Sequence, residues 1–165
     1  MEYFFTIECK LDGFEVEQAK QYFQTSAFHE HICRKLPCTD LDIQRSDLVG
    51  DYYYLERAYN LDLDMPGPIR NLLKGAFRLQ RHDYWNFSSL TASSTLRSTL
   101  PGILSYHTFL KEVDNSIQVQ QKWKLDIGIP LLHKTLAKFA ESEIRKFFAI
   151  EMDIIQKELI AVSKV

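Results

Sequence analysis

The chemically most distinctive residue of this chain is a glutamate placed within an apolar helical stripe. Glu151 follows Phe147 by one helical turn and precedes Ile155 by another, so all three share one face. Glu143 and Glu158 fall in or near the same stripe. A carboxylate facing an apolar interior is costly unless it is paired, hydrogen-bonded or protonated. Glu151 is therefore interpreted as a polar anchor inside an apolar pocket or as a general acid. The alternative is that this part of the helix faces solvent, or that Glu151 caps a buried polar group.

Two further polar residues interrupt the apolar faces of predicted strands. Arg57 lies on the face that carries Leu55 and Tyr59, and Gln121 interrupts the apolar face of the last strand. A buried arginine and a buried glutamate need each other or a polar ligand group, so Arg57 is the expected partner of Glu151. The alternative is a strand twist that lets the guanidinium reach an edge. Gln121 is expected to bind a ligand or the hydroxyl group of a neighbouring strand.

Other reactive residue types form weaker patterns. His82, Asp83 and His107 are possible acid–base groups, but the favoured interpretation is a surface strand pair and an imidazole at a pocket rim. His29 and Cys33 would share a helical face, yet their spacing matches no structural zinc site, so no metal is expected. The sequence has no Gly-x-Ser-x-Gly setting, Gly-rich phosphate loop or Cys-x-x-Cys pair, and no cofactor is expected.

The residues considered above must be positioned by strands and helices, and the last two of these predicted elements are a strand and a long helix. Apolar and polar residues alternate strictly over 116–127, which predicts a half-buried strand. Gly128 and Pro130 end it, and 131–162 reads as one helix, on the order of 45 Å long. Before them the pattern predicts a strand over 3–11, one or two short helices over 14–36, and strands over 39–46, 52–63, 77–90, 91–100 and 103–113.

A short segment between two of these strands is predicted to cover a cavity. Helical spacing over 69–76 follows the sequence Pro66-Gly67-Pro68. Ile69, Leu72 and Leu73 would then plug the mouth of the cavity as a lid. The alternative is an ordinary packed connection.

Composition and charge narrow the class of protein. The 165 residues suit one domain, 1–165, and the net charge of −2 gives no reason to expect nucleic acid or an anionic membrane as partner. Three cysteines without a signal peptide indicate a cytoplasmic protein. No apolar run approaches the roughly 18 residues of a membrane span. Aromatic residues, at 13%, form a large core or line a pocket. The oligomeric state is left open.

The end of the last strand and the start of the helix read Trp123-Lys124-Leu125-Asp126-Ile127-Gly128-Ile129-Pro130-Leu131-Leu132, and Glu143, Glu151 and Leu159-Ile160 follow in the helix. These residues carry a resemblance to a known superfamily. The chain resembles START-like (SRPBCC) proteins, whose fold is that of the birch-pollen allergen, and especially a bacterial branch that is a domain of unknown function. The resemblance implies an α+β helix-grip fold. In it a curved antiparallel sheet of six to seven strands holds a long C-terminal helix, and two short helices follow strand one. It also implies a hydrophobic-ligand pocket between sheet and helix, without implying one activity.

The favoured function is binding or transport of a small hydrophobic molecule, lipid-like or aromatic, without catalysis. The alternatives are a cofactor-free enzyme of the cyclase or dehydratase type, using Glu151, His107 or His82 in the same cavity, and a fully packed domain that serves protein contacts. The expected ligand-binding residues are Tyr53, Leu55, Arg57, Tyr59, Gln121, Trp123, Phe147, Glu151 and Ile154.

Overall fold

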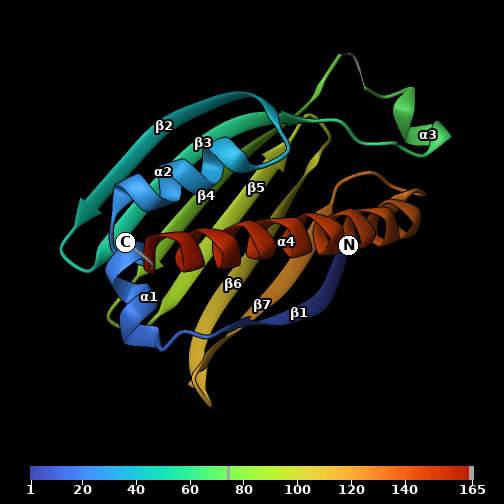
Figure 1. Cartoon of the computed structure of the whole chain (residues 1–165). Coiled ribbons are helices and arrows are strands. Elements are labelled where there is room, and N and C mark those ends of the chain that lie inside the picture. The colour runs from blue at the N-terminus through green and yellow to red at the C-terminus, as the bar shows by residue number, and fades with distance from the viewer. Residues whose placement is uncertain (74, 164–165) are drawn as a thin grey trace.

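The computed structural model describes residues 1–73 and 75–163. Within these residues, seven strands form one sheet, and a long helix lies across its concave face (Figure 1). The strands are β1 (Glu2–Asp12), β2 (Thr39–Val49), β3 (Tyr52–Leu61), β4 (Phe77–Asn86), β5 (Thr91–Ser98), β6 (Gly102–Val113) and β7 (Ser116–Ile127). The helices are α1 (Val16–Phe23), α2 (Ser26–Lys35), α3 (Gly67–Arg70) and α4 (His133–Ser163).

The sheet is antiparallel throughout and runs in the order β1-β7-β6-β5-β4-β3-β2. It is not closed, so β1 and β2 are its edges. Apart from the pairing of β1 with β7, each strand pairs with its neighbour in sequence. Figure 1 shows α1 and α2 beside one end of α4, and α3 beyond the other end. The predicted helix-grip α+β fold is confirmed.

The alternation in β7 explains why this strand lies under α4. Val119, Trp123 and Leu125 are buried, whereas Lys122 and Asp126, at the alternate positions of the strand, are exposed. A period of two places the apolar set on one face of a strand. That face meets the buried side of α4, while the polar set faces solvent.

The helix ends differ from the predictions at two places. α4 begins at His133 rather than at 131, because Leu131 has a φ of 71° and belongs to a turn. α3 is only one turn long, so the helix predicted over 69–76 is wrong. Ile69 is buried but Leu72 is exposed, so the segment has little apolar surface for a longer helix to bury. Lys74, within the predicted helix, lies outside the described residues.

None of the helices within residues 1–73 and 75–163 is both long and apolar enough to span a bilayer.

Candidate ligand-binding cavity

A cavity of about 440 Å³ lies between α4 and the sheet. Small-molecule sites usually measure about 300–1,000 Å³, so this one has room for a ligand. Its wall is mainly apolar. It comes from strands β3 to β7, from the residues that follow β3, and from α4 between Leu136 and Glu151. The apolar lining includes Leu61, Leu63, Met65, Phe77, Leu79, Leu96, Leu100, Leu104, Ile127, Leu136, Phe139, Ala140, Ile144 and Phe147.

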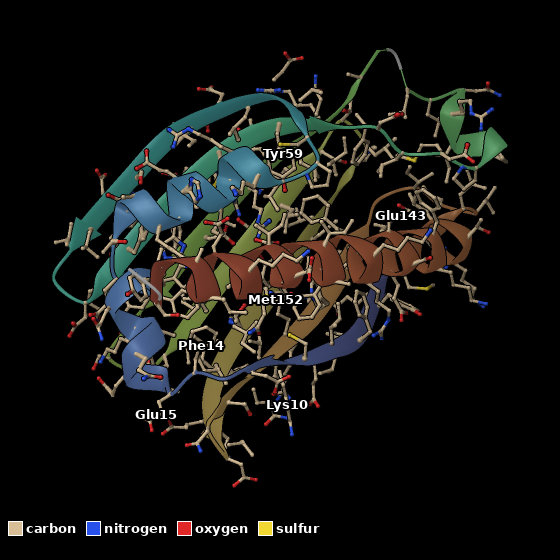
Figure 2. The ribbon with its side chains drawn as sticks, viewed as in Figure 1. Lys10, Phe14, Glu15, Tyr59, Glu143 and Met152 are labelled. Atoms are coloured by element: carbon tan, nitrogen blue, oxygen red, sulfur yellow. The ribbon has the colours of Figure 1, made fainter. Side chains whose placement is uncertain are left out.

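The cavity reaches the protein surface. Asp62, Lys146 and Ile150 line it and are exposed to solvent, and Glu143 of its rim pairs with Lys146 at 3.2 Å. Figure 2 shows Glu143 on the part of α4 nearer to α3, whereas Phe14 lies toward the other end, beside α1. The mouth is therefore rimmed by charged side chains.

Four buried charged residues close the inner end of the cavity. This charged cluster consists of Arg57 of β3, Arg81 and Asp83 of β4, and Glu151 of α4. Arg81 donates from Nη2 to Glu151 Oε1 at 3.2 Å and from Nη1 to Glu151 Oε2 at 3.3 Å. Its Nε lies 3.1 Å from Asp83 Oδ2, and Arg57 Nη2 donates to the same oxygen at 3.0 Å. Two guanidinium groups thus face two carboxylates.

Asp83 is the most heavily bonded member of the charged cluster. Ser94 Oγ donates to Asp83 Oδ1 at 2.6 Å and Tyr106 Oη donates to the same oxygen at 2.9 Å. Burial alone would raise the pKa of Asp83. The guanidiniums of Arg81 and Arg57, together with the two hydroxyl donors, outweigh burial and hold the pKa of Asp83 well below its usual range. Asp83 is therefore ionised at neutral pH.

Gln121 adds a neutral polar group to the wall beside the charged cluster. Trp123 Nε1 donates to Gln121 Oε1 at 3.0 Å. Because an indole N–H can only donate, this bond fixes which end of the amide is the oxygen. The amide nitrogen of Gln121 then has no acceptor within residues 1–73 and 75–163. Gln121 is buried and lines the cavity.

A second cavity, of about 60 Å³, lies beyond the charged cluster. Residues of α1 and α2, including Phe23, Phe28 and His29, line it together with Arg57 and Asp83. Its volume suits about two water molecules, at roughly 30 Å³ each. The Nε of Arg57 is buried without a hydrogen-bond partner among the described residues. The charged cluster therefore separates the large cavity from the small one.

The structure brings most, but not all, of the predicted ligand-binding residues to the large cavity. Tyr59, Gln121, Trp123, Phe147 and Glu151 line it. Tyr59 and Phe147 stack with their ring centroids 6.2 Å apart, and Tyr59 is labelled in Figure 2. These residues come from β3, β7 and α4, as the sequence pattern indicated.

The other four predicted residues lie elsewhere. Leu55 and Arg57 line only the small cavity, whereas Tyr53 and Ile154 line neither. Tyr53 lies beyond the charged cluster, with its ring centroid 4.6 Å from that of His29 in α2. The predicted lining is wrong at Tyr53 and Ile154 because α1, α2 and the end of α4 fill that part of the interior.

The predicted ion pair of Arg57 with Glu151 is present, with 3.9 Å between Arg57 Nη2 and Glu151 Oε1. The hydrogen bonds to Glu151, however, come from Arg81, which was not predicted. Asp83, expected at the surface, is buried. The signal was present in the sequence, since Arg81 and Asp83 alternate with Leu79 on the inner face of β4. β4 also pairs with β3 so that Arg81 stands opposite Arg57.

The two histidines considered as acid–base groups lie outside the cavity. His82 alternates with Arg81 and Asp83, so it lies on the outer face of β4, 3.6 Å from Glu56. His107 is exposed on β6 and bonds Ser93 at 3.1 Å. The idea that either acts inside the cavity is therefore wrong. Within the described residues no three side chains of His, Cys, Asp and Glu gather as a metal site requires.

The predicted lid residues have different environments. Ile69 is fully buried, Leu73 is partly buried and Leu72 is 52% exposed. The preceding residues Leu63 and Met65, rather than these three, line the cavity. The role of the segment as a lid stays a prediction.

Solved structures share this architecture along almost the whole chain. A protein from Thermus thermophilus is 10% identical, with a TM-score of 0.69, over 98% of this chain and 99% of its own. Ara h 8.0201 is 11% identical, with a TM-score of 0.65, over 98% of this chain and 99% of its own. The ZhuI aromatase/cyclase from Streptomyces sp. R1128 is 6% identical, with a TM-score of 0.67, over 96% of this chain and 94% of its own.

Likeness at such low identity establishes the fold alone. No known protein family matches the sequence, and no curated protein matches it significantly. The chain shares the helix-grip fold of these structures.

Proposed function

We propose that this protein binds or carries a small hydrophobic molecule in the large cavity between α4 and the sheet. The observation that carries the proposal is the cavity itself, about 440 Å³ with a mainly apolar wall. Protein interiors normally leave few voids larger than a water molecule. An apolar void of this size lowers stability unless something occupies it, which favours a binding role.

The shape of the wall indicates a ligand with an apolar body and one polar end. Aliphatic and aromatic side chains surround most of the space, while Gln121, Arg81 and Glu151 are grouped at the inner end. The rings of Tyr59 and Trp123 offer flat surfaces for an aromatic body. Lipid-like and aromatic molecules both fit this description.

A fluorescence titration with Nile red, an uncharged apolar dye, tests the proposal. Wild-type protein is expected to shift the dye emission to the blue and to saturate. Ala140 lines the cavity from α4, so Ala140→Trp places an indole inside and should weaken binding at least about tenfold, or 1.4 kcal/mol.

The matched control is Ala149→Trp. Ala149 lies on the same helix, is exposed, and does not line the cavity, so this variant should bind as the wild type does. Failure of the wild type to bind the dye, or equal affinity of the two variants, would contradict the proposal.

A cofactor-free cyclase or dehydratase remains the second candidate. It is favoured by Glu151, a carboxylate on the cavity wall that shares the Arg81 Nη2 donor with the Tyr106 hydroxyl, and by the structural likeness to an aromatase/cyclase. Molecules that co-purify with the protein, identified by mass spectrometry and incubated with it again, discriminate the two. A binder returns them unchanged. An enzyme converts them, and Glu151→Gln slows that conversion.

We also propose that the protein resides in the cytoplasm. Cys9, Cys33 and Cys38 are all free thiols, which suits the reducing cytoplasm. Thiol titration of protein purified without reductant should find three free groups for three cysteines.

A further inference from the structure

The charges at the inner end of the cavity are already balanced. Both Nη atoms of Arg81 bind Glu151, its Nε lies 3.1 Å from Asp83, and Arg57 donates to Asp83 at 3.0 Å. Two buried cations thus face two buried anions. A ligand that brought a net charge to this place would meet no unpaired counter-charge.

The mouth of the cavity offers an anion no better position. Among residues 1–73 and 75–163 the lining includes one lysine, Lys146, which is paired with Glu143 at 3.2 Å, and Asp62 adds a second carboxylate. The formal charge of these rim residues is therefore negative. A carboxylate would be repelled at the rim, and at the inner end it would lose its hydration without gaining a partner.

Unused hydrogen-bond donors, by contrast, are present on the wall. The amide nitrogen of Gln121 has no acceptor among the described residues, and its orientation is fixed by the bond from Trp123. The Tyr59 hydroxyl accepts from Arg81 Nη1 at 3.5 Å, and its own proton likewise has no acceptor among them. Tyr59 lines the large cavity, and Gln121 lines both the large and the small one. Buried donors of this kind favour a ligand that supplies an acceptor.

We infer that the cavity selects an uncharged ligand whose polar end is an oxygen, a carbonyl or a hydroxyl group, and that it rejects a carboxylate of the same size. The inference rests on the proposed function and specifies its ligand class. Gln121 and Tyr59 donate to the neutral oxygen. Both arginines of the charged cluster are already paired with carboxylates, so the cluster offers no counter-charge to a fatty-acid-like anion. Such anions are therefore excluded.

Competition against Nile red tests this selectivity with near-isosteric compounds. Acetonaphthone and naphthoate, substituted at the same ring position, differ in that the ketone has a methyl group where the acid has a charged oxygen. Naphthalene lacks the oxygen altogether. At pH 7 the ketone should displace the dye at a concentration at least about tenfold below that of the carboxylate, and several-fold below that of naphthalene.

The variant Gln121→Leu separates the donor from the shape of the cavity. It should reduce the preference for the ketone over naphthalene while leaving naphthalene binding in place. Gln120→Leu is the matched control, because Gln120 bonds Glu8 outside the cavity and should leave the preference unchanged.

The outcomes distinguish this inference from the proposed function. If Nile red binds and naphthoate competes as well as acetonaphthone, the selectivity is wrong while the binding function stands. If the ketone preference survives in Gln121→Leu, the donor assignment is overturned. If the wild type binds neither dye nor competitors, the proposed function itself fails.

Discussion

Arg81 of β4 and Glu151 of α4 form a bidentate ion pair that joins the sheet to the helix lying across it, with N–O distances of 3.2 and 3.3 Å. Arg81 is simultaneously bonded to Asp83 on its own strand. The pair stands where the large cavity ends and the small one begins. It therefore fixes the position of α4 over the sheet at the place that sets the depth of the large cavity.

We expect Arg81→Met to lower the free energy of unfolding by about 3–5 kcal/mol, because Glu151 loses both of its hydrogen bonds and keeps only Arg57, 3.9 Å away, as a counter-charge. Glu151→Gln should also cost about 3–5 kcal/mol, because Asp83 alone then balances the two buried guanidiniums of Arg57 and Arg81. Urea denaturation of the two variants and the wild type measures both effects.

An exposed ion pair on the same helix supplies the control. Lys157 and Asp153 lie 2.9 Å apart with side chains that are 72% and 59% exposed. Such pairs contribute about 0–1 kcal/mol, so Lys157→Met should leave stability nearly unchanged. If Arg81→Met were equally mild, the charged cluster would not hold α4 in place.

The fold could be predicted from sequence because its signals are local. The strict alternation over 116–127 and the long apolar stripe after it define β7 and α4. Asp114-Asn115 joins β6 to β7, and both residues have the positive φ that such a tight turn requires. Neighbouring strands in sequence then pair with each other, which leaves few alternative sheets.

The site was harder to predict because its partners come from distant segments. Glu151 and Arg57 stand out as single charges within apolar patterns, and both are buried. Arg81 and Asp83 occur as neighbours of His82 in a polar stretch that resembles a surface strand. Alternation with Leu79 is the one local signal that Arg81 faces the interior, and the register of β4 on β3 then places it opposite Arg57. The depth of the cavity depended on where α1 and α2 cover the sheet, which no local pattern specifies.

The rim of the cavity contains a glycine that no other residue should replace. Gly102 has a φ of 129°, and an added Cβ would lie 2.5 Å from the backbone oxygen of Asp126. Gly102→Ala should therefore lower stability by at least about 1–3 kcal/mol. Gly67→Ala is the control, because nothing lies within 4 Å of its added Cβ and alanine there should change stability by less than about 1 kcal/mol. Thermal unfolding measures the stability of both variants, and an equal loss of stability in the two would contradict this view.

The segment 66–76, with Ile69, Leu72 and Leu73, is predicted to act as a lid. Leu63 and Met65 line the cavity, and Ile69 anchors α3 by its burial. Hydrogen exchange should be faster here than in β6 and β7, and it should slow when Nile red is bound while those strands remain unchanged. Exchange in the empty protein as slow as that of the strands would show an ordinary packed connection.

Stability should fall as the pH drops from neutral, and His29 should cause the first part of the loss. Burial beside Tyr53, Trp85 and Phe87 lowers the pKa of His29 from 6.5 to about 4, although the bond to the Phe23 carbonyl opposes this shift. Between these two pH values the unfolded chain binds a proton that the folded protein does not, which favours unfolding as the pH falls. The loss should reach about 2–3 kcal/mol near pH 4.

The variant His29→Gln isolates this contribution. The amide keeps an N–H for the Phe23 carbonyl but does not titrate, so stability should vary less between pH 6.5 and 4 than in the wild type. His107→Gln, at an exposed position on β6, should retain the wild-type slope. Below about pH 4 Asp83 also lowers stability as the pH falls, because its pKa is depressed in the folded protein. Its stabilising contribution is complete above its unfolded pKa and is lost as the folded carboxylate protonates, so both variants should still unfold in acid. Urea titrations at a series of pH values would contradict the assignment if His29→Gln kept the full slope.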